Sequence, residues 1–333
     1  MVPKETDIVV MLNLKRARGT AMWKKLIELR DQDEGASRQY RDFVSKCGLD
    51  PLQEIDSLFL ALPQDTADSG QFALVIRGSF QEERMVQCMR TVAREGGQEV
   101  VETSYGRRKL YSVPGQEGHL AVVAPRIVVL AGKDWVRKVL DLWDGKAAGQ
   151  GGKDNQALAA IIRRTRTGDA LWGAGIVPQS VAERLRGQPE LGAAASMKSV
   201  SGSVDFDKGM TLHVHVDLGS EADAAALTGK INEQFQHARR DRNVQLLGLS
   251  SYFDAIKVEA KGAVLGVRIE LSQAQVDDLS ERLSGLLKTL DVREMSRTRA
   301  SPAEGKNTIS VHKGDTSHDT SRDTKSAAKS GMK

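Results

Sequence analysis

The chain has 333 residues, of which 40% are hydrophobic and 28% charged, values typical of a globular protein of about two domains. No apolar run approaches the roughly 18 residues that a membrane-spanning helix needs, so the composition predicts a soluble protein and excludes a transmembrane one. The net charge is +4, but residues 293–333 alone hold nine Lys or Arg against five Asp or Glu. The rest of the chain is therefore neutral, which argues against a nucleic-acid-binding face.

The first half of the chain alternates between strand and helix patterns. A β-rich apolar run predicts a strand at residues 7–14, and Met22, Leu26 and Leu29 form the helical stripe that follows. Gly48 and Pro51 predict the end of a second helix. Further strands are expected at residues 55–62, 72–77, 99–105, 109–113, 120–124 and 127–131, and helices at 38–46, 81–94 and 133–143.

The second half follows a glycine-rich segment, residues 145–154, which is typical of a flexible linker. The order strand, helix, two strands, helix, strands and helix then occurs again, about 150 residues after its first occurrence. The strands are expected at residues 169–177, 199–206, 210–218, 255–260 and 264–271, and the helices at 179–186, from 219 onward, and at 272–290. This repeated order indicates an internal duplication.

These elements predict an α+β fold of two similar units, each a mostly antiparallel sheet with helices packed on one face. We place the units at residues 1–145 and 169–292, with a linker and a connecting helix at 146–168. Residues 293–333 are dominated by Ser, Thr, Lys, Asp and Gly. Such a segment buries too little apolar surface to offset its ordering entropy, so we expect a disordered, basic tail.

One constellation could carry metal chemistry. Strand alternation places His213, His215 and Asp217 on one face of a predicted strand, and two histidines at i and i+2 with a carboxylate can bind zinc and leave one position open. The alternative is that these three side chains form the solvated face of a half-buried strand. The first half carries no such residues at the matching positions.

Other motifs do not indicate catalysis. The run Gly151–Asp154 lacks the Ser or Thr and the preceding strand of a phosphate-binding loop, and the basic cluster at residues 163–166 lies at the end of a predicted helix, where cations are favoured. There is no nucleophile elbow, and neither cysteine has an activating context. We therefore predict no catalytic residue and favour a protein that is not an enzyme.

The two cysteines leave an alternative open. Cys88 lies on the apolar face of a predicted helix, where it would pack as a small hydrophobic residue. A Cys47–Cys88 disulfide is compatible with the sequence, but spacing alone does not establish it.

The opening at residues 2–7, which runs into an apolar strand, and the run Cys47–Pro51 followed by residues 55–57 resemble a group of bacterial envelope proteins of unknown function. In that group an opening of this kind follows a signal peptide, and the α+β unit is often duplicated. The resemblance implies export and carries no activity, cofactor or catalytic residue. The chain itself shows no signal-peptide pattern, so a cytoplasmic location is the alternative.

Together these features lead us to expect a non-enzymatic binding or scaffold protein of the envelope. It would act through contacts with a protein partner or as a homo-oligomer, and its tail could contact an acidic partner or surface. The alternative is a metal- or small-ligand-dependent activity in a cleft between the two units, with zinc at His213, His215 and Asp217.

Overall fold

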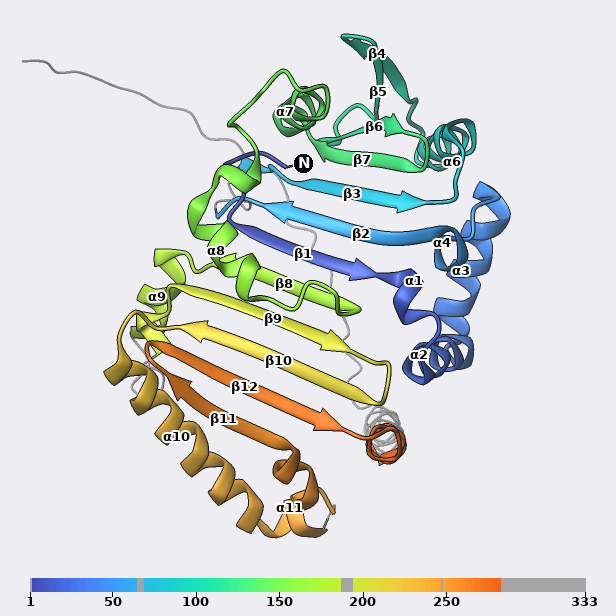
Figure 1. Ribbon diagram of the computed structural model, residues 1–333. Coiled ribbons are helices and arrows are strands. Elements are labelled where there is room, and N and C mark those ends of the chain that lie inside the picture. The colour runs from blue at the N-terminus through green and yellow to red at the C-terminus, as the bar shows by residue number, and fades with distance from the viewer. Residues whose placement is uncertain (1, 65–68, 187–193, 247, 283–333) are drawn as a thin grey trace, which may run out of the picture. The chain divides into compact units, whose positions relative to one another are not determined.

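A computed structural model describes residues 2–64, 69–186, 194–246 and 248–282 of the chain. The strands of this part are β1 (Ile8–Asn13), β2 (Ile55–Leu62), β3 (Ala73–Gly78), β4 (Val101–Tyr105), β5 (Arg108–Ser112), β6 (Gly118–Ala124), β7 (Ile127–Gly132), β8 (Leu171–Ile176), β9 (Ser199–Asp205), β10 (Met210–Asp217), β11 (Ile256–Lys261) and β12 (Val264–Leu271). They form one antiparallel sheet in the order β11-β12-β10-β9-β8-β1-β2-β3-β7-β6-β5-β4 (Figure 1).

The pairing of β1 with β8 joins the two halves of the chain. Val10 lies opposite Gly173, and the ladder extends from Ile8 to Leu12. Outward from this pair the strand order is β1-β2-β3-β7-β6 on one side and β8-β9-β10-β12-β11 on the other, with β5 and β4 added at the first edge. Both predicted units therefore contribute to a single continuous sheet.

The helices connect these strands and pack at the strand ends and on the faces of the sheet (Figure 1). They are α1 (Leu14–Ala17), α2 (Ala21–Gln32), α3 (Glu34–Cys47), α4 (Pro51–Glu54), α6 (Glu82–Glu95), α7 (Lys133–Trp143), α8 (Gln156–Arg164), α9 (Gln179–Arg186), α10 (Glu221–Arg240) and α11 (Arg242–Leu246), with 3-10 turns η1 (Gly152–Asp154) and η3 (Ser250–Ala255). Residues 273–282 are also helical. As predicted, α3 ends at Gly48, whose φ of 60° is the left-handed conformation that glycine adopts without strain.

One face of the sheet, here the α7 face, carries the largest core. Trp135, Val136, Val139 and Leu140 of α7 and Leu158 and Ile161 of α8 pack on it, together with inward side chains of β1, β2, β3, β6, β7 and β8. Trp172 of β8 belongs to the same cluster, so residues from both halves of the chain share one core.

The opposite face, here the α6 face, is covered near its two ends. At one end Val86 and Cys88 of α6 pack on Val128 and Leu120, and at the other end Ala224 of α10 packs near Leu265. A disulfide joins Cys47 at the end of α3 to Cys88 of α6. This resolves the alternative that the cysteine spacing left open.

The structure confirms the α+β class and the antiparallel sheet. Helices pack on both faces rather than on one, because the strands of the first half carry apolar side chains on both sides. The predicted linker at residues 145–154 is held by backbone hydrogen bonds from Gly152 to Val2 and from Lys4 to Gln150. The domain division remains a prediction, and the predicted tail at 293–333 lies outside the described residues.

Candidate functional sites

The middle of the α6 face is an open apolar surface. Eleven side chains on five neighbouring strands point to it, and none of them is fully buried. They are Ile8, Val10 and Leu12 of β1, Leu58, Leu60 and Leu62 of β2, Leu171 of β8, Val200 and Val204 of β9, and Leu212 and Val214 of β10. We call this set the central apolar face. Val10 is 37% exposed and Val200 is 40% exposed, unusual values for valines in the middle of a large sheet.

The central apolar face lies between two groups of helices that cover the same side of the sheet. The cluster around α6 and the end of α3 reaches as far as Ile76 of β3, and the cluster around α10 reaches Val216 of β10. The strands between them keep apolar side chains that receive no comparable cover from the described helices. The layer of helices on the α6 face is therefore interrupted.

A shallow hollow of about 600 Å³ lies on this surface, and its lining is almost wholly apolar. Three glycines, Gly173, Gly175 and Gly202, form its floor, and Gly173 lies directly opposite Gly202 across β8 and β9. Because glycine has no side chain, these residues form a strip of bare backbone beside Val10 and Val214, where another backbone can come close to the sheet.

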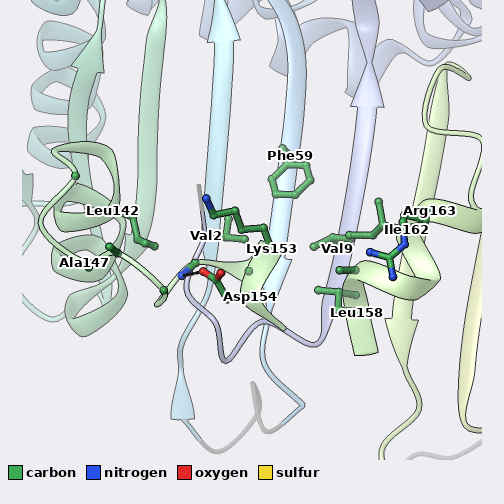
Figure 2. Close-up of a pocket in the computed structure, with 16 residues that line it drawn as sticks. Val2, Val9, Phe59, Leu142, Ala147, Lys153, Asp154, Leu158, Ile162 and Arg163 are labelled. Atoms are coloured by element: carbon green, nitrogen blue, oxygen red, sulfur yellow. Dashed lines mark hydrogen bonds between the residues drawn. The ribbon is translucent and has the colours of Figure 1, made fainter. Parts of the chain in front are cut away.

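A second cavity, of about 870 Å³, lies on the α7 face between α7 and α8 (Figure 2). Its apolar wall includes Val9 of β1, Phe59 of β2 and Leu142 of α7, with Leu158 and Ile162 of α8. We call this cavity the α7–α8 pocket. It opens over β1 and β2, which lie between the strands that α7 and α8 contact.

The α7–α8 pocket exists because the segment along one side of it has small side chains. Six lining residues from the end of α7 to the first residue of η1 are glycine or alanine: Gly145, Ala147, Ala148, Gly149, Gly151 and Gly152. The segment is fixed from beneath, since Gly152 donates to the carbonyl of Val2 and Asn155 donates to the carbonyl of Thr6 at 2.9 Å. A Cβ at Gly152 would lie 2.8 Å from Val2, so this close approach requires glycine.

Three ionisable side chains line the α7–α8 pocket. The Asp154 carboxylate accepts the backbone N–H of Gly151 at 3.0 Å and so closes the turn before α8. Lys153 and Arg163 are exposed, and in Figure 2 they lie on either side of Val9. Within the described part of the chain, neither cation forms an ion pair or a hydrogen bond.

His213, His215 and Asp217 lie on the same face of β10, as the alternation predicts. Their partners on β9 are Ser203, Ser201 and Ser199, three buried serines on the α7 face. This predicted face is confirmed by the register of the strands.

The surroundings of these three residues are cationic. Arg166 approaches the His213 ring nitrogen Nε2 at 3.3 Å, and Arg164 lies 3.6 Å from the Asp217 carboxylate. Burial, followed by the charges of Arg166 and Arg268, lowers the pKa of His213 below its usual value of 6.5. Among the described residues no three His, Cys, Asp or Glu side chains are grouped as metal ligands. The zinc site therefore remains a prediction, with no arrangement of ligands to support it.

The sequence patterns indicate neither the central apolar face nor the α7–α8 pocket. Lys153 lies in a run that lacks the features of a phosphate-binding loop, and Arg163 begins a basic cluster that is expected at a helix end. The available signal was the run of small residues from 145 to 152, which has the composition of a linker and in the folded chain forms a cavity wall.

In the described part of the chain, no helix is both long and apolar enough to cross a membrane. No protein-family model matches the chain, and no curated protein matches it. Solved structures of a protein named TP0453, in several crystal forms, are similar to it at 11–13% sequence identity. Crystal form III covers 84% of this chain and 98% of that one with a TM-score of 0.44, and crystal form I covers 85% and 97% with a TM-score of 0.42. At these values the likeness assigns neither a family nor a function.

Proposed function

We propose that this protein is a non-enzymatic binding protein that holds an amphipathic helix of a protein partner on its central apolar face. The observation that carries the proposal is the interrupted helix layer, in which apolar side chains on five neighbouring strands remain partly exposed between the clusters of α6 and α10. Contiguous apolar surface of this kind is the usual mark of an interaction site.

The dimensions of the central apolar face suit a helix. From β2 to β10 there are four strand spacings, about 19 Å at about 4.8 Å each. An α-helix with its side chains is about 10–12 Å wide, so one helix can lie between the existing ones. The glycine strip at Gly173 and Gly202 lets its apolar side approach the sheet closely, in the manner of helix-in-groove recognition.

Two further features are part of the proposal. The Cys47–Cys88 disulfide supports an exported, envelope-associated protein, because disulfides persist mainly in oxidising compartments. Trapping thiols with a maleimide during lysis of the native cells tests this, since an exported chain would show no free thiol without reductant. The strand orders β1-β2-β3-β7-β6 and β8-β9-β10-β12-β11 correspond position by position, and this correspondence supports an internal duplication of the α+β unit.

The test is native mass spectrometry of the full-length protein, purified gently from its own cells, beside the variants Val10→Glu and Val200→Glu. Both valines are already exposed, so a carboxylate there disturbs folding little but places a charge where the partner's apolar surface must lie. We expect a stoichiometric protein partner on the wild-type chain that is lost from both variants.

The matched control is Val101→Glu, at a valine that is 43% exposed on the edge strand β4, away from the central apolar face. It should keep the partner. A wild-type chain that is a bare monomer at every concentration would overturn the proposal, as would a partner that survives both Val10→Glu and Val200→Glu. A homo-oligomer that these two variants dissociate would assign the face to a second copy of the chain instead.

A further inference from the structure

We infer that the α7–α8 pocket, on the face opposite the central apolar face, is a binding site for a small amphipathic anion. The ligand would place an alkyl or aromatic body against Val9 and Phe59 and an acid group at the Arg163 side of the pocket. Lys153, on the other side of Val9, adds a second positive charge to the lining. The inference concerns a different site and a different ligand class from the partner proposed above, and it stands independently of that partner.

The shape of the pocket favours a small molecule. Its volume of about 870 Å³ lies within the range of about 300–1,000 Å³ found for small-molecule sites, and its wall is mainly apolar. The wall is also held in place before any ligand arrives. Backbone hydrogen bonds from Gly152 to Val2 and from Lys4 to Gln150 fix one side, and Asn155 caps α8 on the other by accepting the N–H of Leu158. A fixed wall reduces the ordering cost of binding.

The charge at the edge of the pocket specifies the ligand class. The side chains of Lys153 and Arg163 form no ion pair or hydrogen bond with another residue that the structure describes, whereas the one carboxylate of the lining, Asp154, accepts the Gly151 N–H. An acid group at the Arg163 side would meet the guanidinium, which can hold a carboxylate or phosphate through two parallel hydrogen bonds, and Lys153 adds positive charge from the other side of the pocket. The same two positive charges would repel a cationic ligand. A neutral ligand would gain no electrostatic attraction from them.

Arg164, the next residue on α8, is a matched comparison for Arg163. Arg164 follows Arg163 on α8 but pairs with Asp217 at 3.6 Å and does not line the pocket. The two side chains have the same charge and adjacent positions on one helix. Of these two arginines, only Arg163 should therefore contribute to anion binding.

The experiment is isothermal titration of the full-length protein with decanoate and decyltrimethylammonium below their micelle concentrations and with decanol below its solubility limit. The three probes share one alkyl chain and differ in the charge of the head group. We expect saturable binding of one decanoate per chain, at least tenfold weaker binding of decanol, and no measurable binding of the cation. Arg163→Met should weaken decanoate binding about fivefold and Lys153→Met by a smaller factor, while Arg164→Met should leave it unchanged.

A second variant tests the cavity without touching its charges. Ala147→Phe places an aromatic ring in the space beside Leu142 and should abolish decanoate binding while circular dichroism remains that of the wild type. If that variant misfolds, the Arg163 and Arg164 pair still decides the question. The inference is overturned if decanoate does not bind saturably, if the cationic probe binds as well as decanoate, or if Arg164→Met weakens binding as much as Arg163→Met.

Discussion

At the scale of single residues, the Asp144 carboxylate forms ion pairs with three cationic side chains. Asp144 follows α7, where its side chain receives Arg108 at 2.7 Å, Arg107 at 3.4 Å and Lys146 at 3.6 Å. Arg108 also donates to the carbonyl of Val123 at 2.7 Å, so the pair ties the end of α7 to β5 and β6. Asp144 and Arg108 are only 10% and 11% exposed, which limits screening by water.

This arrangement predicts an acid dependence of stability. The hydrogen bond from Arg108 is the main cause that lowers the pKa of Asp144 below its ordinary 3.8. A carboxylate whose pKa is depressed in the folded state stabilises the fold above its unfolded pKa, and that contribution is lost as pH falls through the folded pKa. Urea unfolding at pH 6 and at pH 2.5 should therefore show a smaller drop in stability for Asp144→Asn than for the wild type.

Asp141→Asn is the control for that measurement. Asp141 lies on the same helix and accepts a hydrogen bond from the Tyr105 hydroxyl at 2.8 Å. Asp141→Asn should leave the Arg108–Asp144 pair in place, and with it the acid dependence that this pair causes. Equal drops in the wild type and in Asp144→Asn would show that the paired carboxylate contributes nothing to acid stability.

At the scale of elements, the end of α3 and the middle of α6 are joined by the Cys47–Cys88 disulfide. The two residues are 41 positions apart, and the chain between them contains α4, β2 and β3. Leu49 and Phe80 pack in the same cluster, so the bond connects elements that already share a core. Its main effect should be to restrict the unfolded chain.

Removing the bond is therefore expected to destabilise the protein without changing its fold. For a closed loop of this length the chain-entropy model gives a loss of about 4 kcal/mol in the free energy of unfolding. The double variant Cys47→Ser with Cys88→Ser should unfold at a lower urea concentration than the oxidised wild type, with a similar far-UV spectrum. Reductant should shift the wild-type midpoint toward that of the double variant and leave the double variant itself unchanged; identical midpoints in all samples would contradict the prediction.

At the scale of the whole molecule, the pairing of β1 with β8 makes one sheet from the two halves of the sequence. Trp135 and Trp172, one from each half, are buried in the same core cluster. Arg16 adds an ion pair with Asp205 at 3.0 Å across 189 positions of sequence. Neither half can lose this core without exposing apolar surface of the other.

Residues 2–281 should consequently unfold in one cooperative transition. Tryptophan fluorescence and far-UV circular dichroism should give coincident urea curves, and calorimetry should give a single peak for this part of the chain. Trp172→Ala should lower the free energy of unfolding by about 3–5 kcal/mol, as expected for a buried aromatic side chain. The midpoint of the single transition should fall accordingly, and the transition should not split. Two separated peaks, one of them insensitive to Trp172→Ala, would instead show that the halves fold independently.

Local sequence predicted much of the secondary structure. The apolar run at residues 55–62 coincides with β2, the helix end at Gly48 is where α3 stops, and alternation along β10 puts His213 and His215 on one face. These features depend on residues within a few positions of one another, because strand and helix periods act over that range. The four-residue helices α1 and α4 were not predicted, since each is too short to show a period.

Local patterns in the chain therefore suffice for the class of the fold, the order of most elements and the charge of its parts. The folded structure was needed to show that β1 pairs with β8, that Cys47 bonds to Cys88, and that residues 145–152 form the wall of a pocket rather than a free linker. It also decided which apolar strand faces receive a helix and which remain open. The physical reason is the same in each case: these outcomes depend on which surfaces meet across long separations in sequence, and a local pattern of apolar and polar residues does not name its partner.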